Sequence, residues 1–158
     1  MAIGPDDFRA TLGRFASGVT VLTVRDAQSI DHGMTVSAFC SLSLEPPLVL
    51  ACIDRATDMF KVLPRVKHFG ISILEEGQEA LSRRFAELPS SRFDGFGYTR
   101  AESGVVLLDD ALAHLECRVV DHYDAGDHVI YVGHVEWASC GQGRPLLYYR
   151  GGYAQLER

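Results

Sequence analysis

The residues between Gly33 and Asp54 bring several hydroxyl side chains close together in the sequence. Four of them fall within nine residues: Thr35, Ser37, Ser41 and Ser43. Hydroxyls both donate and accept hydrogen bonds, and with neighbouring backbone N–H groups they can surround a phosphate or the polar edge of a planar ligand. The segment therefore predicts one wall of a binding site. The same spacing is also typical of a strand whose alternate hydroxyls face water.

A second segment carries side chains that suit a phosphate and a planar ring. Arg83 and Arg84 follow Ser82 and precede Phe85 on an expected helix. The forked guanidinium donors match a phosphate, and the phenyl ring can cover a planar ring. A solvated helix face explains the two arginines equally well.

A histidine at an expected hairpin end is the third candidate. His128 begins a strand directly after Gly126 and Asp127, where glycine permits a tight turn. An imidazole in that position can stack on a nicotinamide carboxamide or hydrogen-bond to it. An ordinary exposed turn histidine is the alternative. No Cys or Ser lies at a fixed spacing from His128, so the sequence does not support a nucleophilic triad.

Missing motifs narrow the chemistry further. The sequence has no G-x-G-x-x-G after an expected strand and no G-x-x-x-x-G-K-[ST], so a nucleotide site would lie against strands rather than on a glycine-rich turn. The six histidines show no H-x-x-x-H spacing, which leaves the metal hypothesis weak. Four cysteines without C-x-x-C spacing favour buried apolar thiols over zinc ligands or disulfides: Cys40, Cys52, Cys117 and Cys140.

The composition is that of a globular protein. The chain has 158 residues, of which 47 % are hydrophobic and 23 % charged, and we expect residues 1–158 to form a single domain. The formal net charge of −6 argues against a nucleic-acid partner. No apolar run approaches the roughly 20 residues that span a bilayer, and the first residues lack a secretory signal. We therefore expect a cytoplasmic protein without a membrane partner.

Local patterns predict mostly strands. Apolar residues at helical spacing predict short helices over residues 5–16, 57–63 and 78–88, the last ended by Pro89. β-Branched and alternating apolar residues predict strands over residues 19–24, 30–40, 48–53, 69–74, 111–119, 129–137 and 145–150. The continuous apolar run at 48–53 is typical of a central strand covered on both faces.

The connections complete the expected architecture. Residues 90–104 are polar and contain glycine, which predicts a long loop, and residues 121–128 are typical of a turn-rich connection between two strands. Six or seven strands that do not alternate regularly with helices favour a mainly β fold. We expect an antiparallel barrel with two or three helices at its margins.

Taken together and in this order, several segments resemble the short-chain flavin reductases, the reductase components of two-component flavin-dependent monooxygenases. The resemblance covers almost the whole chain, and the joint pattern is specific although each segment alone is not. The segments are His32 to Phe39, Ser41-Leu42-Ser43, Pro46-Pro47-Leu48, Leu81 to Ala86, Gly126-Asp127-His128 and Pro145 to Tyr153.

The resemblance implies an antiparallel split β-barrel of the FMN-binding type. Such a barrel forms a homodimer and holds its flavin at the subunit interface. The implied reaction is hydride transfer from NADH or NADPH to FMN or FAD, and the reduced flavin is supplied to a separate monooxygenase.

The resemblance also implies which residues hold the nucleotides. Those expected along the isoalloxazine ring and the ribityl chain are Thr35, Val36, Ser37, Ala38 and Ser43. Those expected to border the same pocket are Ile53, Asp54 and Thr57. Those expected at the phosphate end are Ser82, Arg83, Arg84 and Phe85. On the nicotinamide side the resemblance implies Tyr153 and His128, with His128 as the catalytic residue.

Two other functions stay open from the residues. A split-barrel flavoprotein can keep its flavin for electron shuttling, storage or sensing without rapid reaction with NAD(P)H, and a barrel without flavin can serve as an interaction module. The segment Gly126-Asp127-His128 favours the reductase, because a protein that only binds flavin leaves it without a task. The sequence separates neither FMN from FAD nor NADH from NADPH.

Overall fold

The computed structural model of the chain describes residues 1–87 and 93–157. The expected helix end at Leu88 and Pro89, and the first residues of the expected loop 90–104, lie outside these ranges. No helix in the described ranges is both long and apolar enough to cross a membrane.

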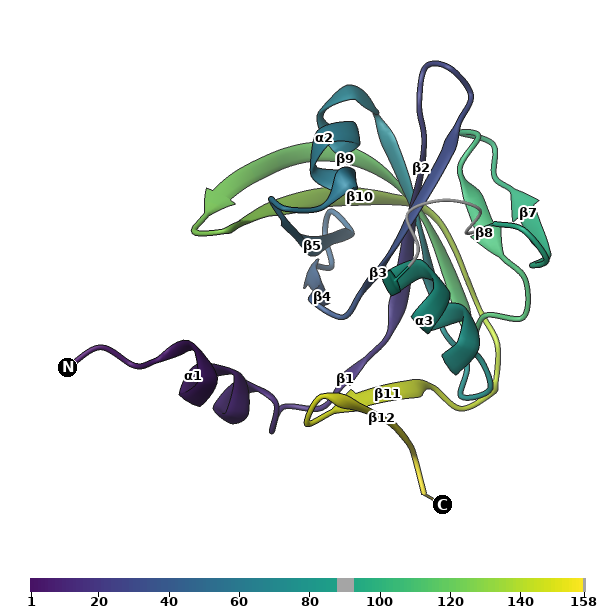
Figure 1. Ribbon diagram of the computed structural model, residues 1–158. Helices are drawn as coiled ribbons and strands as arrows, with labels where there is room; N and C mark the ends of the chain where they lie inside the picture. The colour runs from purple at the N-terminus through teal and green to yellow at the C-terminus, as the bar shows by residue number, and fades with distance from the viewer. Residues whose placement is uncertain (88–92, 158) are drawn as a thin grey trace.

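Seven antiparallel strands form the main sheet. They are β2 (Thr20–Arg25), β3 (Asp31–Val36), β4 (Phe39–Ser43), β5 (Leu48–Asp54), β6 (His68–Ile73), β9 (Ala113–Ala125) and β10 (His128–Cys140). Their order across the sheet is β3-β2-β6-β9-β10-β5-β4. Val36 of β3 and Ile53 of β5 lie near opposite ends of this order, yet both belong to one buried cluster with Phe69 and Tyr131. The sheet therefore curls around this cluster into a barrel (Figure 1).

Two smaller sheets flank the barrel. One has the order β1 (Ser17–Gly18), β11 (Leu146–Tyr149), β12 (Gly152–Gln155), and the other pairs β7 (Tyr98–Arg100) with β8 (Val106–Leu108). Figure 1 shows β7 and β8 beside the barrel, with β11 and β12 at its lower end. A second buried cluster lies on the outer side of the wall and joins residues from these pieces, among them Val21, Phe85, Val106 and Leu146.

Helix α3 (Glu79–Glu87) packs on β2 and β3 through its buried residues Leu81, Ser82 and Phe85. These positions recur at helical spacing and lie on one face of the helix. The close approach requires Gly33 on β3, because a Cβ at that position would lie 2.6 Å from the Phe85 ring. The shorter α2 (Asp58–Val62) and the 3₁₀ turn η1 (Leu63–Arg65) follow β5.

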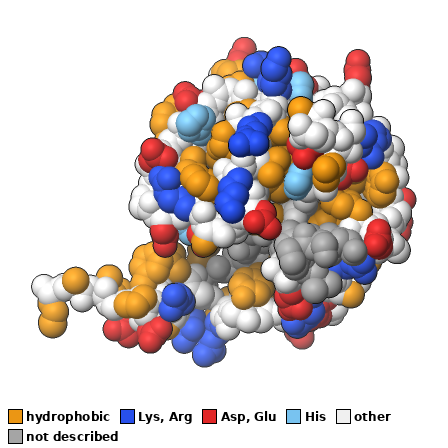
Figure 2. All heavy atoms as spheres, turned by 45° about the horizontal axis from the view of Figure 1, so that its top comes forward, with side chains coloured by type: hydrophobic (Ala, Val, Ile, Leu, Met, Phe, Trp, Pro, Cys, Tyr) orange, Lys and Arg blue, Asp and Glu red, His pale blue; other side chains and the backbone are white. Residues whose placement is uncertain are grey.

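Helix α1 (Pro5–Leu12) projects away from the barrel (Figure 1), and none of its residues is buried. The expected apolar face is present but uncovered, since Phe8 is 53 % exposed, Leu12 51 % and, beyond the helix, Phe15 81 %. Figure 2 shows hydrophobic side chains along this projecting segment. The helix ends four residues earlier than the sequence pattern predicts, at Leu12, with Gly13 as its C-cap.

The described structure corrects the expected strand boundaries. The single strand expected over residues 30–40 is two strands, β3 and β4, separated by Ser37 and Ala38. Residues 98–100 of the expected loop form β7, which pairs with β8 at residues 106–108, just beyond the loop. Residues 121–125 continue β9, so only Gly126 and Asp127 connect the two long strands. Gly126 has a φ of +61°, a conformation that glycine adopts without strain.

The expectation of a central, doubly covered strand at 48–53 is wrong. β5 lies next to the end of the sheet, between β10 and β4. Its residues alternate between buried and half-buried, so only one face packs on the core. The run is apolar throughout because its half-buried outer positions, Leu48, Leu50 and Cys52, are apolar as well. The local sequence does not distinguish these positions from core positions. The mainly β class and the marginal helices are confirmed.

Candidate functional site

Three predicted site residues from distant parts of the chain meet beside α3. Thr35 Oγ1 donates a hydrogen bond to the Ser82 carbonyl oxygen at 2.7 Å, and the Ser82 Oγ lies 2.8 Å from the Tyr153 hydroxyl oxygen. The Arg83 guanidinium lies over the Tyr153 ring, 4.9 Å from its centroid. These contacts tie β3, α3 and β12 together, so the Thr35 hydroxyl holds the helix in place.

The four residues expected at the phosphate end divide between the two faces of α3. Ser82 and Phe85 are fully buried and support the helix from behind, and their contact with a flavin stays a prediction. Helical spacing turns Arg83 outward instead. Its guanidinium pairs with Glu79 at 2.7 Å, and that hydrogen bond raises the pKa of Arg83. Arg84 lies over the Phe96 ring, 5.1 Å from its centroid.

The connection between β3 and β4 consists of Ser37 and Ala38, here called the β3–β4 link, and both residues are exposed. The Ala38 carbonyl accepts a hydrogen bond of 2.9 Å from the Cys52 N–H of β5. Within the described ranges no hydrogen bond uses the Ser37 hydroxyl or the N–H groups of the two link residues. The link therefore presents one hydroxyl and two backbone donors to a ligand.

The neighbours expected to line the same wall are less accessible. Val36 is 3 % exposed and Ile53 is fully buried, and both side chains belong to the barrel core. Alternation along a strand turns these side chains inward, and the contact of these residues with the flavin stays a prediction. Ser43, which ends β4 opposite Leu48, is half-buried, whereas Ser41 is exposed.

His128 lies opposite Asp54 in the pairing of β10 with β5. Its Nδ1 is 2.7 Å from Asp127 Oδ1, and this hydrogen bond lowers the pKa of Asp127. The Thr57 hydroxyl donates to the Asp54 carbonyl oxygen at 2.7 Å, and Asp54 Oδ1 accepts from the Ala56 N–H at 2.8 Å. We call Asp54, Thr57, Asp127 and His128 the β5–β10 corner.

The corner and the β3–β4 link flank β5 from opposite sides, because β5 lies between β10 and β4. Val49, Ala51 and Ile53 point into the core, so Cys52 and Asp54 point to the outer face. Ala38 lies beside Cys52, and His128 lies beside Asp54. Two residues along a strand span about 7 Å, so the link and the histidine are offset by about that distance along β5 and lie on either side of it.

A cavity of about 560 Å³ lies between β3, the start of α2 and α3. Thr57 and Phe85 are the only predicted site residues at its edge within the described ranges. Sequence reasoning missed most of its lining, including Asp31, Met34, Asp58 and Asp94. One side of this cavity is lined by His32, Gly33 and Met34, which belong to a segment that carries the family resemblance.

The cysteines differ in their surroundings. Cys117 is buried, and burial raises the pKa of its thiol to about 12. Cys40 and Cys140 are exposed, so the expectation of buried thiols is wrong for these two. In the described part of the chain no three His, Cys, Asp or Glu side chains are grouped so as to hold a metal ion.

The curled antiparallel sheet with marginal helices defines a split β-barrel. The chain belongs to the flavin reductase like domain family, whose sequence model matches residues 12–157. The NADH-dependent flavin reductase of a Rhodococcus species is 42 % identical over 161 residues, covering 98 % of this chain and 88 % of that protein. The reductase component of 4-hydroxyphenylacetate 3-monooxygenase from Thermus thermophilus is 43 % identical over 150 residues, covering 94 % of this chain and 95 % of that protein.

Solved structures agree with this assignment. The NADH:FAD oxidoreductase of Streptomyces globisporus C-1027, solved in complex with NAD and FAD fragments, superposes with a TM-score of 0.92. It is 36 % identical in sequence, and the superposition covers 99 % of this chain and 97 % of that chain. The resemblance inferred from the motifs is thereby confirmed at the level of the family.

Proposed function

We propose that this chain is an NAD(P)H:flavin oxidoreductase, a single-domain enzyme that reduces FMN or FAD by hydride transfer and supplies the reduced flavin to a separate monooxygenase. One observation carries the proposal. The β3–β4 link, with its unused donors, and His128 flank β5 from opposite sides and are offset by two residues along that strand. This arrangement lets a flat ring system lie against the link while a second ring approaches from the side of the histidine.

The donors at the link fit a flavin. The Ser37 hydroxyl and the N–H groups of Ser37 and Ala38 can hydrogen-bond to the carbonyl and nitrogen acceptors at the edge of an isoalloxazine ring. The exposed guanidinium of Arg83, with Arg84 one position further along α3, supplies positive charge for a flavin phosphate. The flavin itself supplies the hydride acceptor when it is bound.

His128 is suited to position the nicotinamide. Its Nδ1 faces the Asp127 carboxylate, which accepts a hydrogen bond from the Nδ1–H group. In the neutral imidazole Nε2 is then an acceptor, which matches the NH₂ group of a carboxamide. Hydride transfer requires two rings held close together in the correct orientation and no protein nucleophile. The role of His128 is therefore to bind and orient the donor.

We further infer that the enzyme is a homodimer. The exposed Phe8, Leu12 and Phe15 form an apolar surface on a segment that projects from the barrel (Figure 2). A second copy of the chain would cover it by burying the same surface on both subunits. The flavin then lies at the subunit interface, where both barrels exclude water from it.

Steady-state and spectroscopic assays with two flavins and two nicotinamides test this function. Purified protein, FMN or FAD, and NADH or NADPH are mixed without oxygen, and loss of the flavin absorption band is followed. We expect rapid bleaching in at least one of the four combinations. A protein that binds flavin tightly but bleaches in none is a flavoprotein of the storage or sensing type. A protein that binds no flavin contradicts both interpretations.

A further inference from the structure

A second cavity, of about 630 Å³, lies between the β7–β8 hairpin and the outer face of β9 and β10. None of the residues assigned above to flavin or nicotinamide lines it. We call it the hairpin cavity. Its volume is in the range of sites that bind small molecules.

The floor of the hairpin cavity contains a buried carboxylate without a counter-charge. Glu116 of β9 is 8 % exposed, and its Oε2 accepts a hydrogen bond of 2.7 Å from the Ser103 N–H. In the described part of the chain no hydrogen bond uses Glu116 Oε1, and no cation pairs with this carboxylate. The Ser103 hydroxyl oxygen is buried there without a partner. A buried charge is costly unless it is paired, so this arrangement favours a cationic ligand.

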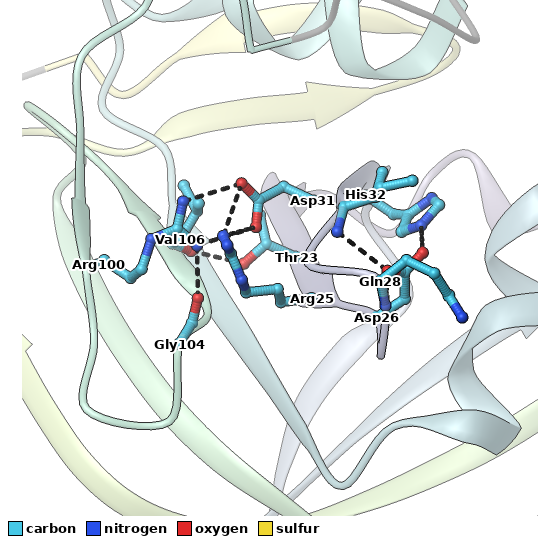
Figure 3. Close-up of polar contacts among 10 residues, drawn as sticks. Thr23, Arg25, Asp26, Gln28, Asp31, His32, Arg100, Gly104 and Val106 are labelled. Carbon is cyan, nitrogen blue, oxygen red and sulfur yellow. Dashed lines mark hydrogen bonds and ion pairs between the residues drawn. The ribbon is translucent and has the colours of Figure 1, made fainter.

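The other charges around the cavity do not neutralise Glu116. Arg100 lines the cavity, but its guanidinium makes two hydrogen bonds of 3.0 Å to the Asp31 carboxylate and one of 2.7 Å to the Gly104 carbonyl oxygen. Figure 3 shows Arg100 and Arg25 both directed at Asp31. Arg100 thus directs its hydrogen bonds to Asp31 and Gly104 and not to Glu116.

A second carboxylate stands at the rim. Glu136 is the unpaired residue of a β-bulge in β10, between Val135 and Trp137. Bulges redirect side chains, and this one places Glu136 3.2 Å from His68 Nε2. Glu136 Oε2 also lies 3.6 Å from Arg118 Nε. Glu136 is therefore shared between two basic side chains, while Glu116 has no basic partner among residues 1–87 and 93–157.

A flat aromatic surface completes the lining. Trp137 pairs with Glu116 across the two strands and is 48 % exposed. Guanidinium groups bind carboxylates through parallel donors and stack on indole rings, which a spherical ammonium does less well. We propose that the hairpin cavity binds a small molecule bearing a guanidinium group, with its donors on Glu116 and Ser103 and its plane against Trp137. This site is independent of the flavin site.

Trp137 is the only tryptophan in the sequence, so its fluorescence reports this cavity directly. The purified protein is titrated with methylguanidinium chloride at constant ionic strength and at concentrations far below those that unfold proteins. Methylurea, which has a similar shape and no charge, is the matched ligand control. We expect a saturable fluorescence change with methylguanidinium and none with methylurea. No saturable change, or an equal change with methylurea, would overturn the proposal.

Two variants test whether the Glu116 carboxylate binds the guanidinium group. Glu116→Gln keeps an acceptor for the Ser103 N–H and removes the charge, so we expect the dissociation constant to rise by at least about tenfold. Glu157→Gln changes the same charge outside the cavity and should bind as the unaltered protein does. Unchanged binding by Glu116→Gln would overturn the assignment, and so would propylammonium binding as tightly as methylguanidinium.

Folding of the variant is checked separately. Circular dichroism and flavin reduction by Glu116→Gln should match the unaltered protein, because Glu116 lies outside the flavin site. If this variant does not fold, Glu136→Gln replaces it. We then expect the dissociation constant for methylguanidinium to rise a few fold, because the Glu136 carboxylate contributes to the negative electrostatic potential in the cavity. Unchanged binding by a folded Glu136→Gln would count against the site.

Discussion

Thr35 on β3 and Ser82 on α3 are 47 positions apart in the sequence and are joined by a hydrogen bond of 2.7 Å from the Thr35 hydroxyl to the Ser82 carbonyl oxygen. Ser82 in turn contacts the Tyr153 hydroxyl. A hydroxyl that the sequence places among ligand-binding groups thus serves to hold the helix against the barrel. The exposed β3–β4 link begins two residues after Thr35, so the position of the link depends on this contact.

Thr35→Val should destabilise the fold. The substitution keeps the shape of the side chain and removes the hydroxyl, so we expect a loss of about 1 kcal/mol in the free energy of unfolding. Urea denaturation measures it. Thr11→Val removes a hydroxyl that bonds to the Asp7 carbonyl oxygen on the exposed α1 and should have little effect. Equal losses in the two variants would show that the Thr35 contact has no special role.

Gly33→Ala should move α3 away from β3. A Cβ at Gly33 would lie 2.6 Å from a ring atom of the fully buried Phe85, so the helix or the ring must shift. Overpacking of this kind costs about 1–3 kcal/mol. Thermal unfolding measures the loss. Gly4→Ala is the control, because nothing lies within 4 Å of a Cβ there. A melting temperature unchanged in Gly33→Ala would contradict the tight packing of helix on strand.

His128→Ala should weaken the nicotinamide step and leave flavin binding nearly intact. Loss of one hydrogen bond to the carboxamide should raise the KM for NADH or NADPH, or lower the rate of hydride transfer, by about tenfold. Stopped-flow reduction and flavin titration separate the two effects. His122→Ala, on the exposed part of the same hairpin, is the matched control. Unchanged reduction kinetics in His128→Ala would remove His128 from the site.

The pair of Asp26 and His32 should make stability depend on acid pH. The hydrogen bond from His32 at 2.8 Å, together with the Ile30 N–H, lowers the pKa of Asp26. A carboxyl whose pKa is lowered by folding stabilises the folded state above its unfolded pKa, and this contribution is lost as pH falls through the lower folded value, below about pH 4. His32→Ala should raise the pKa of Asp26, which an NMR titration of its carboxyl carbon detects. A pKa that stays low in His32→Ala would assign the shift to the backbone donors instead.

Charge on the projecting N-terminal segment should disrupt the proposed homodimer. Leu12→Asp combined with Phe15→Asp places carboxylates on the apolar surface, and light scattering after size exclusion should then show a monomer. Ile30→Asp places a carboxylate on an exposed side chain of the β2–β3 turn and should leave the dimer intact. A dimer that persists in the double variant would mean that another surface joins the subunits.

Local pattern alone predicted much of the fold. Alternating apolar residues on either side of Gly126 indicated the long β9–β10 hairpin, and the spacing of Leu81 and Phe85 indicated α3. Both signals lie within contiguous residues, where side-chain periodicity reports one buried face. The joint motif pattern also indicated the family, because it combines short segments in a fixed order along nearly the whole chain.

Tertiary structure decided which of the predicted residues are exposed and which are buried. Ser82, Phe85 and Ile53 carry the right chemistry in the sequence but are fully buried, whereas the β3–β4 link is exposed. The pairing of His128 with Asp54, and the buried Glu116 beneath the β7–β8 hairpin, also appear only after folding. Local periodicity determines that an element has an inner and an outer face. Strand register and helix packing then decide which elements cover that outer face. The residues that make these contacts are far apart in the chain, so a short stretch of sequence does not contain both of them.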